Sequence, residues 1–192
     1  YKKKLISIIL LILSLGFHHS MVLPIVAFII CKYYRKPKTY LIVWAISLII
    51  AIAHITYFQT LFGGMADDQG AGYLAMDNSG YRTSFRLDFV IYSSAPVILG
   101  YYIINKWRYA SKTYNFIYCL YLLTNSVWML CMYASFTNRI AYLSWFMLPI
   151  VLIYPFFDKP FIRNQYKKLN VVVWCHLGFT LMMTYVYYGF IK

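Results

Sequence analysis

Two clusters of polar side chains interrupt an otherwise apolar sequence, and the first combines imidazoles with a hydroxyl. Phe17 is followed by His18, His19 and Ser20 inside an apolar segment. Ionisable groups at membrane depth are costly, so they tend to face a cavity or the interior of a helix bundle. A neutral imidazole accepts a proton from an attacking hydroxyl, or donates a hydrogen bond to a phosphate oxygen. The alternative is that one histidine caps a broken helix while the other extends to the membrane interface.

The second cluster is the stretch from Tyr81 to Asp88, which carries two arginines and an aspartate. If this stretch is helical, Arg82 and Arg86 are four residues apart and share a face. Two adjacent guanidiniums form a bidentate clamp for a phosphate or a diphosphate. Asp88 would orient Arg86 or hold another inward-facing group. The alternative is a pair of interfacial arginines contacting lipid phosphates, with Asp88 as an N-terminal helix charge.

A third polar stretch, Ser135 to Arg139, is a short turn between two apolar segments. Arg139 is either a plain interfacial anchor or a third arginine that converges on the same site. His54 and His176 occur singly in apolar segments, where a lone histidine is more often a core residue than a catalytic one.

The sequence predicts no metal site and no cofactor. Two adjacent aspartates beside glycines favour a solvated turn, because no convincing further ligands accompany them. The four cysteines lack CxxC spacing and lie within apolar runs, which indicates small core residues. They are Cys31, Cys119, Cys131 and Cys175.

Composition indicates an integral membrane protein. The chain is 62% hydrophobic and 12% charged, whereas soluble domains have about 25% charged residues. A net charge of +13 in such a chain chiefly sets orientation and contacts anionic lipid headgroups. Membrane lipids are therefore expected partners, and nucleic acid is not.

A helix that crosses a bilayer needs about 20 mostly apolar residues, and several segments approach that length. We therefore predict an all-α fold, a polytopic transmembrane helix bundle in which residues 1–192 form a single transmembrane domain. Its five full spans are expected at Tyr40–Phe62, Leu87–Ile104, Tyr114–Ala134, Ile140–Phe157 and Leu169–Ile191.

Lysine and arginine alternate between rich and poor connections along the chain. Successive connections carry four, two, three, one and four such residues. By the positive-inside rule the rich connections are cytoplasmic. The polar loop of residues 63–88 and the turn of residues 135–139 are therefore expected to be extracytoplasmic.

The first apolar segment, Leu5 to Cys31, departs from this alternation because cationic residues flank both ends. Glycine, histidine, serine and proline also interrupt it. It is either one long kinked span or a broken helix that forms a re-entrant hairpin, which is tolerated where it is buried in protein or lines a wet cavity. The chain starts without methionine, so we expect a C-terminal fragment of a longer polytopic protein.

Three stretches together resemble the EpsG family of bacterial exopolysaccharide and capsular polysaccharide polymerases, which are of the Wzy type. They are FHHSMVLPIVAF, FRLDFVIYSSAPVILGYY and TNSVWMLCMYASFTNRIAYLSWFMLPIVLIYP, in that order. The resemblance implies a multi-pass protein of the bacterial inner membrane. It also implies transfer of a growing glycan from polyprenyl diphosphate to a lipid-linked repeat unit on the outer face, without a cofactor, alongside other envelope polysaccharide assembly proteins.

The resemblance assigns roles to the matching residues, and Arg82 joins them from its spacing to Arg86. The catalytic set is His18, His19 and Asp88. The substrate-binding set is Ser20, Arg82, Arg86, Asn138 and Arg139.

The arginines would stabilise charge on the diphosphate leaving group, and a histidine or aspartate would act as the base toward the acceptor hydroxyl. The main alternative is a permease or flippase-like carrier for a lipid-linked or anionic solute, in which the same arginines bind without covalent chemistry. A non-catalytic subunit of an envelope assembly is a third possibility.

Overall fold

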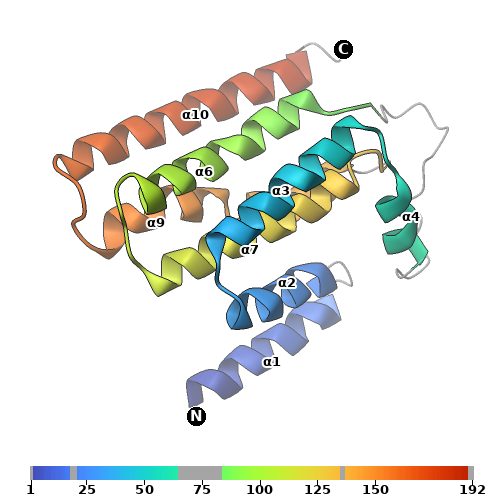
Figure 1. Ribbon diagram of the computed structural model, residues 1–192, viewed down its shortest axis with the longest axis horizontal. Helices are drawn as coiled ribbons and strands as arrows, with labels where there is room; N and C mark the ends of the chain where they lie inside the picture. Colours follow the sequence, from blue (N-terminus) through green and yellow to red (C-terminus); the bar gives the residue numbers. More distant parts are fainter. Residues whose placement is uncertain (1, 18–20, 65–83, 135–136, 190–192) are drawn as a thin grey trace.

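The computed structural model describes residues 2–17, 21–64, 84–134 and 137–189, and every regular element within these ranges is helical. The predicted all-α class is therefore confirmed for this part of the chain (Figure 1). The helices are α1 (Lys2–Phe17), α2 (Val22–Tyr33), α3 (Pro37–Ile52), α4 (Tyr57–Gly64), α6 (Leu87–Asn105), α7 (Lys112–Leu130), α8 (Thr137–Trp145), α9 (Leu148–Asp158) and α10 (Gln165–Gly189).

Helix α7 is the centre of the bundle, because it contacts α2, α3, α6, α8 and α9. Its N-cap is Ser111, whose hydroxyl accepts a hydrogen bond from the backbone N–H of Tyr114. Helix α10 lies outside this group and packs along α6 and α9 (Figure 1). The fully buried large side chains of α7 are Tyr114, Tyr118, Tyr121, Leu122, Asn125, Trp128 and Met129.

A tyrosine of α7 compensates for a proline in α9. Pro155 has no backbone N–H, so the carbonyl of Val151, four residues earlier, lacks its usual helical donor. The hydroxyl of Tyr114 donates a hydrogen bond to that carbonyl at 3.1 Å. The two helices are thus joined at a point where the α9 backbone would otherwise leave a buried acceptor without a donor.

Two more tyrosines of α7 bind the backbone of α6 on either side of Pro96. Tyr118 donates to the carbonyl of Val97 at 2.7 Å, and Tyr121 donates to the carbonyl of Ser93 at 2.8 Å. These hydroxyls are buried, so the bonds satisfy polar groups that have no access to water. They also fix the depth at which α6 lies against α7.

The predicted span Tyr40–Phe62 is wrong as a single helix. Helix α3 ends at Ile52, and His54 follows with φ 57°. The N–H of Ile55 bonds the carbonyl of Ile50 at 3.2 Å, which is the closing bond of a Schellman motif around a left-handed residue. His54 is therefore an exposed turn residue, not a core residue of a span.

The predicted span Ile140–Phe157 is divided into α8 and α9. Pro149 occupies the first turn of α9 and supplies no N–H to the carbonyl of Trp145, so the helix is interrupted between them. Residues 137–158 nevertheless form one stretch that is long and apolar enough to cross a bilayer, and residues 87–105 form another.

Those two are the stretches of the described chain that meet both criteria, so the expected count of five spans stays a prediction. Helices α2 and α3 are apolar but shorter. Helix α7 has sufficient length but carries Asn115, Thr124, Asn125 and Ser126. The last three form side-chain hydrogen bonds within the bundle.

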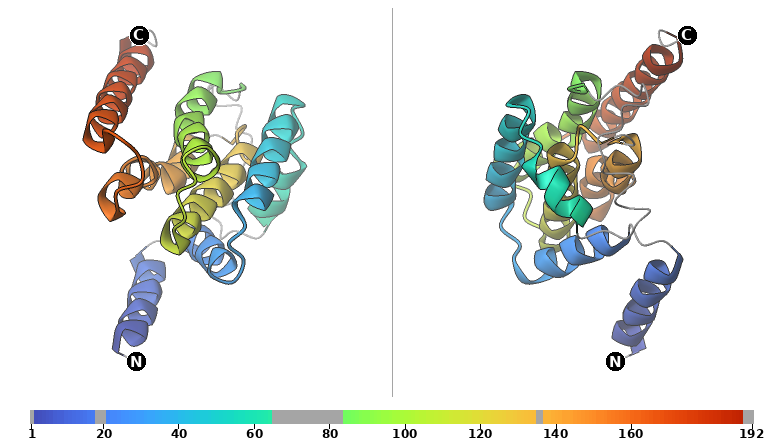
Figure 2. Two further views of the ribbon diagram at one scale, coloured as in Figure 1. Left: turned by 60° about the vertical axis from the view of Figure 1, so that its left-hand side comes forward. Right: turned by 90° about the vertical axis from the view of Figure 1, so that its right-hand side faces the viewer.

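The N-terminal segment forms two helices, α1 and α2, rather than one. Figure 2 shows that α2 lies across the ends of α3 and α7 instead of running along them. Phe28 of α2 packs edge-on against Phe116 of α7 at 5.2 Å between ring centroids. His18, His19 and Ser20 lie outside the described residues, and the membrane topology of this segment stays a prediction.

Cationic side chains gather at one end of the bundle. Arg35 lies over the ring of Phe116 near the start of α7, and Lys168 lies over Trp107 in the α6–α7 connection. Lys159 Nζ donates to the carbonyl of Ala110 at 2.7 Å. The connections α2–α3, α6–α7 and α9–α10 therefore meet there. The lysines and arginines of these connections and of the adjoining helix ends are Lys32, Arg35, Lys36, Lys38, Lys106, Arg108, Lys112, Lys159, Arg163, Lys167 and Lys168.

The close approach of α6 to α7 generates a stability prediction. A Cβ atom on Gly100 would lie 2.3 Å from the Tyr118 ring, which its own hydrogen bond holds in place. Gly100→Ala is expected to lower the free energy of unfolding by about 1–3 kcal/mol, measured by thermal unfolding in detergent. Gly178→Ala is the matched control, because its Cβ would meet nothing within 4 Å.

The control should be neutral or stabilising by about 0.5–1 kcal/mol, since alanine is the better helix former. Equal stability of the two variants would contradict the packing described for α6 and α7.

Candidate functional site

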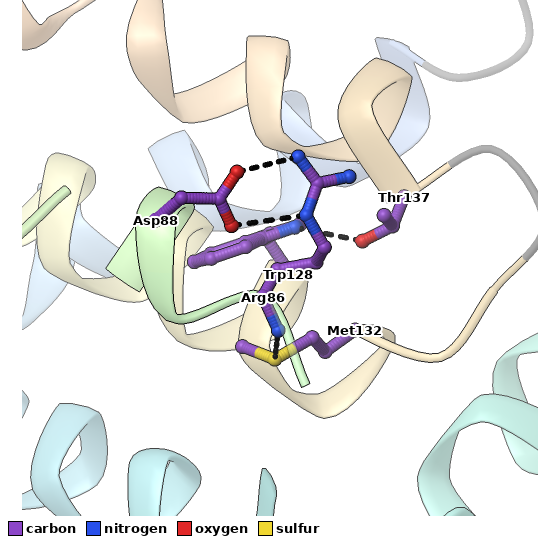
Figure 3. Close-up of polar contacts among 5 residues, drawn as sticks. All are labelled: Arg86, Asp88, Trp128, Met132 and Thr137. Carbon is purple, nitrogen blue, oxygen red and sulfur yellow. Dashed lines mark hydrogen bonds and ion pairs between the residues drawn. The ribbon is translucent and has the colours of Figure 1, made fainter. Parts of the chain in front are cut away.

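The end of the bundle opposite the cationic connections holds a bidentate ion pair. The Arg86 guanidinium donates from Nε to Asp88 Oδ1 at 3.0 Å and from Nη2 to Oδ2 at 2.7 Å (Figure 3). Arg86 is the N-cap residue of α6, with φ −92° and ψ 72°, and Asp88 is in the first turn. This non-helical backbone turns the arginine side chain back over the helix start. A carboxylate at that position also complements the helix dipole.

The sequence-based clamp assumed that the helix already includes both arginines. Helix α6 begins at Leu87, so Arg86 precedes it and does not present a helical face. Arg82 lies outside the described residues. The i, i+4 argument for the two arginines is therefore wrong at Arg86, and the ion pair with Asp88 is what sets its orientation.

The arginine of the ion pair lies over an aromatic ring. The Arg86 guanidinium carbon is 3.7 Å from the centroid of the Phe89 ring, a cation–π contact. The backbone N–H of Arg86 lies 3.4 Å from the sulfur of Met132. The side chain of Arg86 is 15% exposed and that of Asp88 is 32% exposed. The pair is thus partly shielded from solvent, and this shielding makes the attraction between the two charges stronger than it would be in open water.

Trp128 connects Phe89 to the start of helix α8. Its Nε1–H donates to the hydroxyl of Thr137 at 3.0 Å, and Figure 3 shows the indole beside the ion pair. Thr137 is buried and begins α8. Asn138 and Arg139 follow it, and the Asn138 side-chain oxygen accepts from the Arg139 backbone N–H at 3.0 Å. The start of α8, with the exposed Arg139, is thereby brought to the same end as Arg86.

The buried side-chain amide of Asn125 holds together the helices that carry the site. Asn125 Oδ1 accepts from Trp44 Nε1 at 2.9 Å, and its Nδ2 donates to Ser144 Oγ at 3.0 Å. One side chain of α7 thus bridges α3 and α8. Trp145 Nε1 also donates to Ser93 Oγ at 2.8 Å, which links α8 to α6. Sequence reasoning missed these residues, although an asparagine and serines within apolar helices were the available signal.

An exposed imidazole lies at the same end. The His54 ring is 3.9 Å from the Tyr133 ring, measured between centroids. The Tyr133 hydroxyl donates to the Ala51 carbonyl at 2.7 Å. The preceding residue, Met132, is the one whose sulfur meets the backbone N–H of Arg86. The turn after α3 is therefore part of the site region. No signal in the sequence indicated that His54 ends a helix, because glycine or asparagine usually occupies this left-handed position.

The described chain has one other histidine and four cysteines. His176 is on α10, where Nδ1 is buried and has no hydrogen-bond partner among the residues that the structure describes. Cys31, Cys119 and Cys131 are buried and Cys175 is exposed, all as free thiols. Within the described ranges, no group of three or more His, Cys, Asp or Glu side chains is arranged to hold a metal ion.

The chain belongs to the EpsG family, whose model matches residues 1–192. No curated protein and no solved structure matches it. Family membership and the two apolar stretches of membrane length are together consistent with a membrane protein.

The Trp128–Thr137 bond can be tested directly. Thr137→Val keeps the shape of the side chain but leaves the buried indole N–H without an acceptor, so we expect a loss of about 1–2 kcal/mol of stability. Thr137→Ser keeps the hydroxyl and should retain most of the stability. Chemical or thermal unfolding of both variants in detergent measures the difference, and a valine variant as stable as the serine variant would contradict the assignment.

Proposed function

We propose that this protein is a membrane glycan polymerase. It transfers a growing polysaccharide from polyprenyl diphosphate to a lipid-linked repeat unit on the outer face of the bacterial inner membrane. Membership of the EpsG family supports this proposal. The observation that carries it is the arginine, oriented by a carboxylate and partly buried, at the end of the bundle opposite the cationic connections.

The chemical demand of the reaction falls on the leaving group. The acceptor hydroxyl oxygen bonds to the anomeric carbon, the bond from that carbon to the diphosphate oxygen breaks, and the electron pair leaves with the diphosphate. Negative charge therefore grows on the leaving oxygen, and preorganised donors that meet it there lower the barrier. A guanidinium suits phosphate oxygens, and the contacts with Asp88 and Phe89 hold the Arg86 guanidinium in place before substrate arrives.

Other residues complete the binding of the donor and the acceptor. Arg139 adds a second positive charge from α8, and Arg82 a third from the loop. Asn138 and Ser20 supply neutral hydrogen-bonding groups suited to sugar hydroxyls. These assignments extend the sequence analysis. Those of Asn138 and Arg139 are supported by their position at the start of α8, at the same end as Arg86.

Asp88 is better suited to positioning than to proton transfer. Both of its carboxylate oxygens accept hydrogen bonds from Arg86, which favours the charged form and makes it a weak base. The proton of the acceptor hydroxyl is then assigned to an imidazole. His18 and His19 come from the sequence analysis, and His54 is the histidine that the structure places beside Tyr133 at this end.

Replacement of Arg86 tests this proposal. Arg86→Lys keeps the charge but loses the planar guanidinium that Asp88 orients, so we expect kcat for glycan elongation to fall by about 10²–10³, the cost of losing one oriented donor. The measurement follows product length in proteoliposomes supplied with lipid-linked repeat units. Arg163→Lys is the matched control, because Arg163 is exposed in the α9–α10 connection at the opposite end, and it should elongate normally.

Two results would contradict the proposal. One is normal elongation by Arg86→Lys. The other is wild-type protein that moves lipid-linked units across the bilayer without lengthening the glycan, which would make it a carrier. Asp88→Asn separates positioning from base catalysis: a positioning role predicts partial loss with an unchanged pH profile, whereas a base predicts loss of the acidic limb of that profile, where the rate falls as the base becomes protonated.

A further inference from the structure

We infer that a groove between α6, α9 and α10 holds the isoprenoid chain of the lipid-linked substrate, an inference that rests on the proposed function. The groove has two adjoining lobes of about 320 Å³ and 370 Å³. Both lobes are lined by Leu152 of α9 and by Val172 and His176 of α10. Apart from His176, Thr180 and the thiol of Cys175, the lining is hydrocarbon or aromatic, which suits an apolar ligand.

One stripe of α6 runs from the ion pair to this groove. Asp88, Tyr92, Ala95 and Leu99 recur at the spacing that places residues on one helical face. Ala95 and Leu99 line the groove, and Asp88 holds Arg86. At 1.5 Å per residue, the stripe from Asp88 to Leu99 is about 16 Å long. A charged end and an apolar end therefore lie on the same face of one helix.

Aromatic contacts make this path continuous. Phe89, which lies under Arg86, is 4.8 Å from Trp145, and Trp145 is 4.9 Å from Tyr92, measured between ring centroids. The Tyr92 ring is 5.6 Å from Phe179 of the groove wall. Phe89 itself is only 4% exposed, so a hydrocarbon chain that leaves a diphosphate at Arg86 would pass over the partly exposed rings of Trp145 and Tyr92 before it reaches Phe179 in the groove wall.

The distribution of charge selects an amphiphile whose head binds at Arg86. The groove is open rather than enclosed and carries no charged lining residue, so it offers a headgroup no site of its own. A polyprenyl diphosphate satisfies both ends at once, with its anion at the guanidinium and its branched hydrocarbon along Tyr92 and Leu99. A phospholipid that merely coats the groove is the competing occupant, and the experiment distinguishes the two.

The probe is a sugar-free polyprenyl diphosphate with a photoactivatable diazirine partway along its chain, bound to the purified protein in nanodiscs. Adducts mapped by mass spectrometry are expected on the groove walls of α6, α9 and α10. Cys175→Trp fills the groove from an exposed lining position and should lower these adducts at least about fivefold. Leu181→Trp is the matched control on α10, because Leu181 is 61% exposed, and its adducts should equal those of wild type.

Adducts confined to other helices would overturn the inference. So would groove adducts that excess phosphatidylglycerol removes as well as unlabelled polyprenyl diphosphate does, because that result assigns the groove to ordinary lipid. The test is separable from the proposed function. Groove adducts without glycan elongation would support the chain-binding groove and refute the polymerase function. Elongation without groove adducts would support the polymerase function and refute the groove.

Discussion

The requirement to satisfy the polar groups of α7 inside an apolar bundle determines how the other helices pack. Three tyrosine hydroxyls of α7 donate to backbone carbonyls of α6 and α9, beside the prolines that weaken those helices. Asn125 does the same for α3 and α8 through side chains. Each bond fixes a helix at a particular depth and rotation, because no water is available to replace it. Specific pairing thereby supplements hydrophobic contact, which alone would permit sliding.

The same framework explains why one end of the bundle is suited to binding an anion. Eleven described lysines and arginines lie in the connections at the other end or in the helix ends beside them, whereas Arg86 and Arg139 lie at the site end. The arginine at the site is not a loose surface charge, since a carboxylate and an aromatic ring fix it. Trp128 joins that ring to the start of α8. The site is thus built from contacts between helix ends that the α7 bonds have already aligned.

Local signals in the sequence predicted some of this arrangement and could not predict the rest. Helix α6 was expected at Leu87–Ile104 and forms at Leu87–Asn105, because charge bounds a continuous apolar run. Pro149 was a visible signal that the span predicted at Ile140–Phe157 would be divided, and the prediction did not use it. The turn at His54 had no such signal, and its conformation depends on packing against Tyr133. Bonds such as Trp44 to Asn125 join residues far apart in sequence, so they appear only once the helices are placed. The ion pair was anticipated as one of two roles for Asp88, and the structure supplies its geometry.

The central claim is that Arg86 receives the diphosphate of the lipid carrier. Determining a structure of the protein with sugar-free polyprenyl diphosphate bound in nanodiscs tests it most directly. The account predicts that the diphosphate oxygens lie within hydrogen-bond distance, about 3 Å, of the Arg86 guanidinium, at the start of α6. A diphosphate bound instead among the lysines and arginines of the α6–α7 and α9–α10 connections, with the Arg86–Asp88 pair untouched, would contradict it.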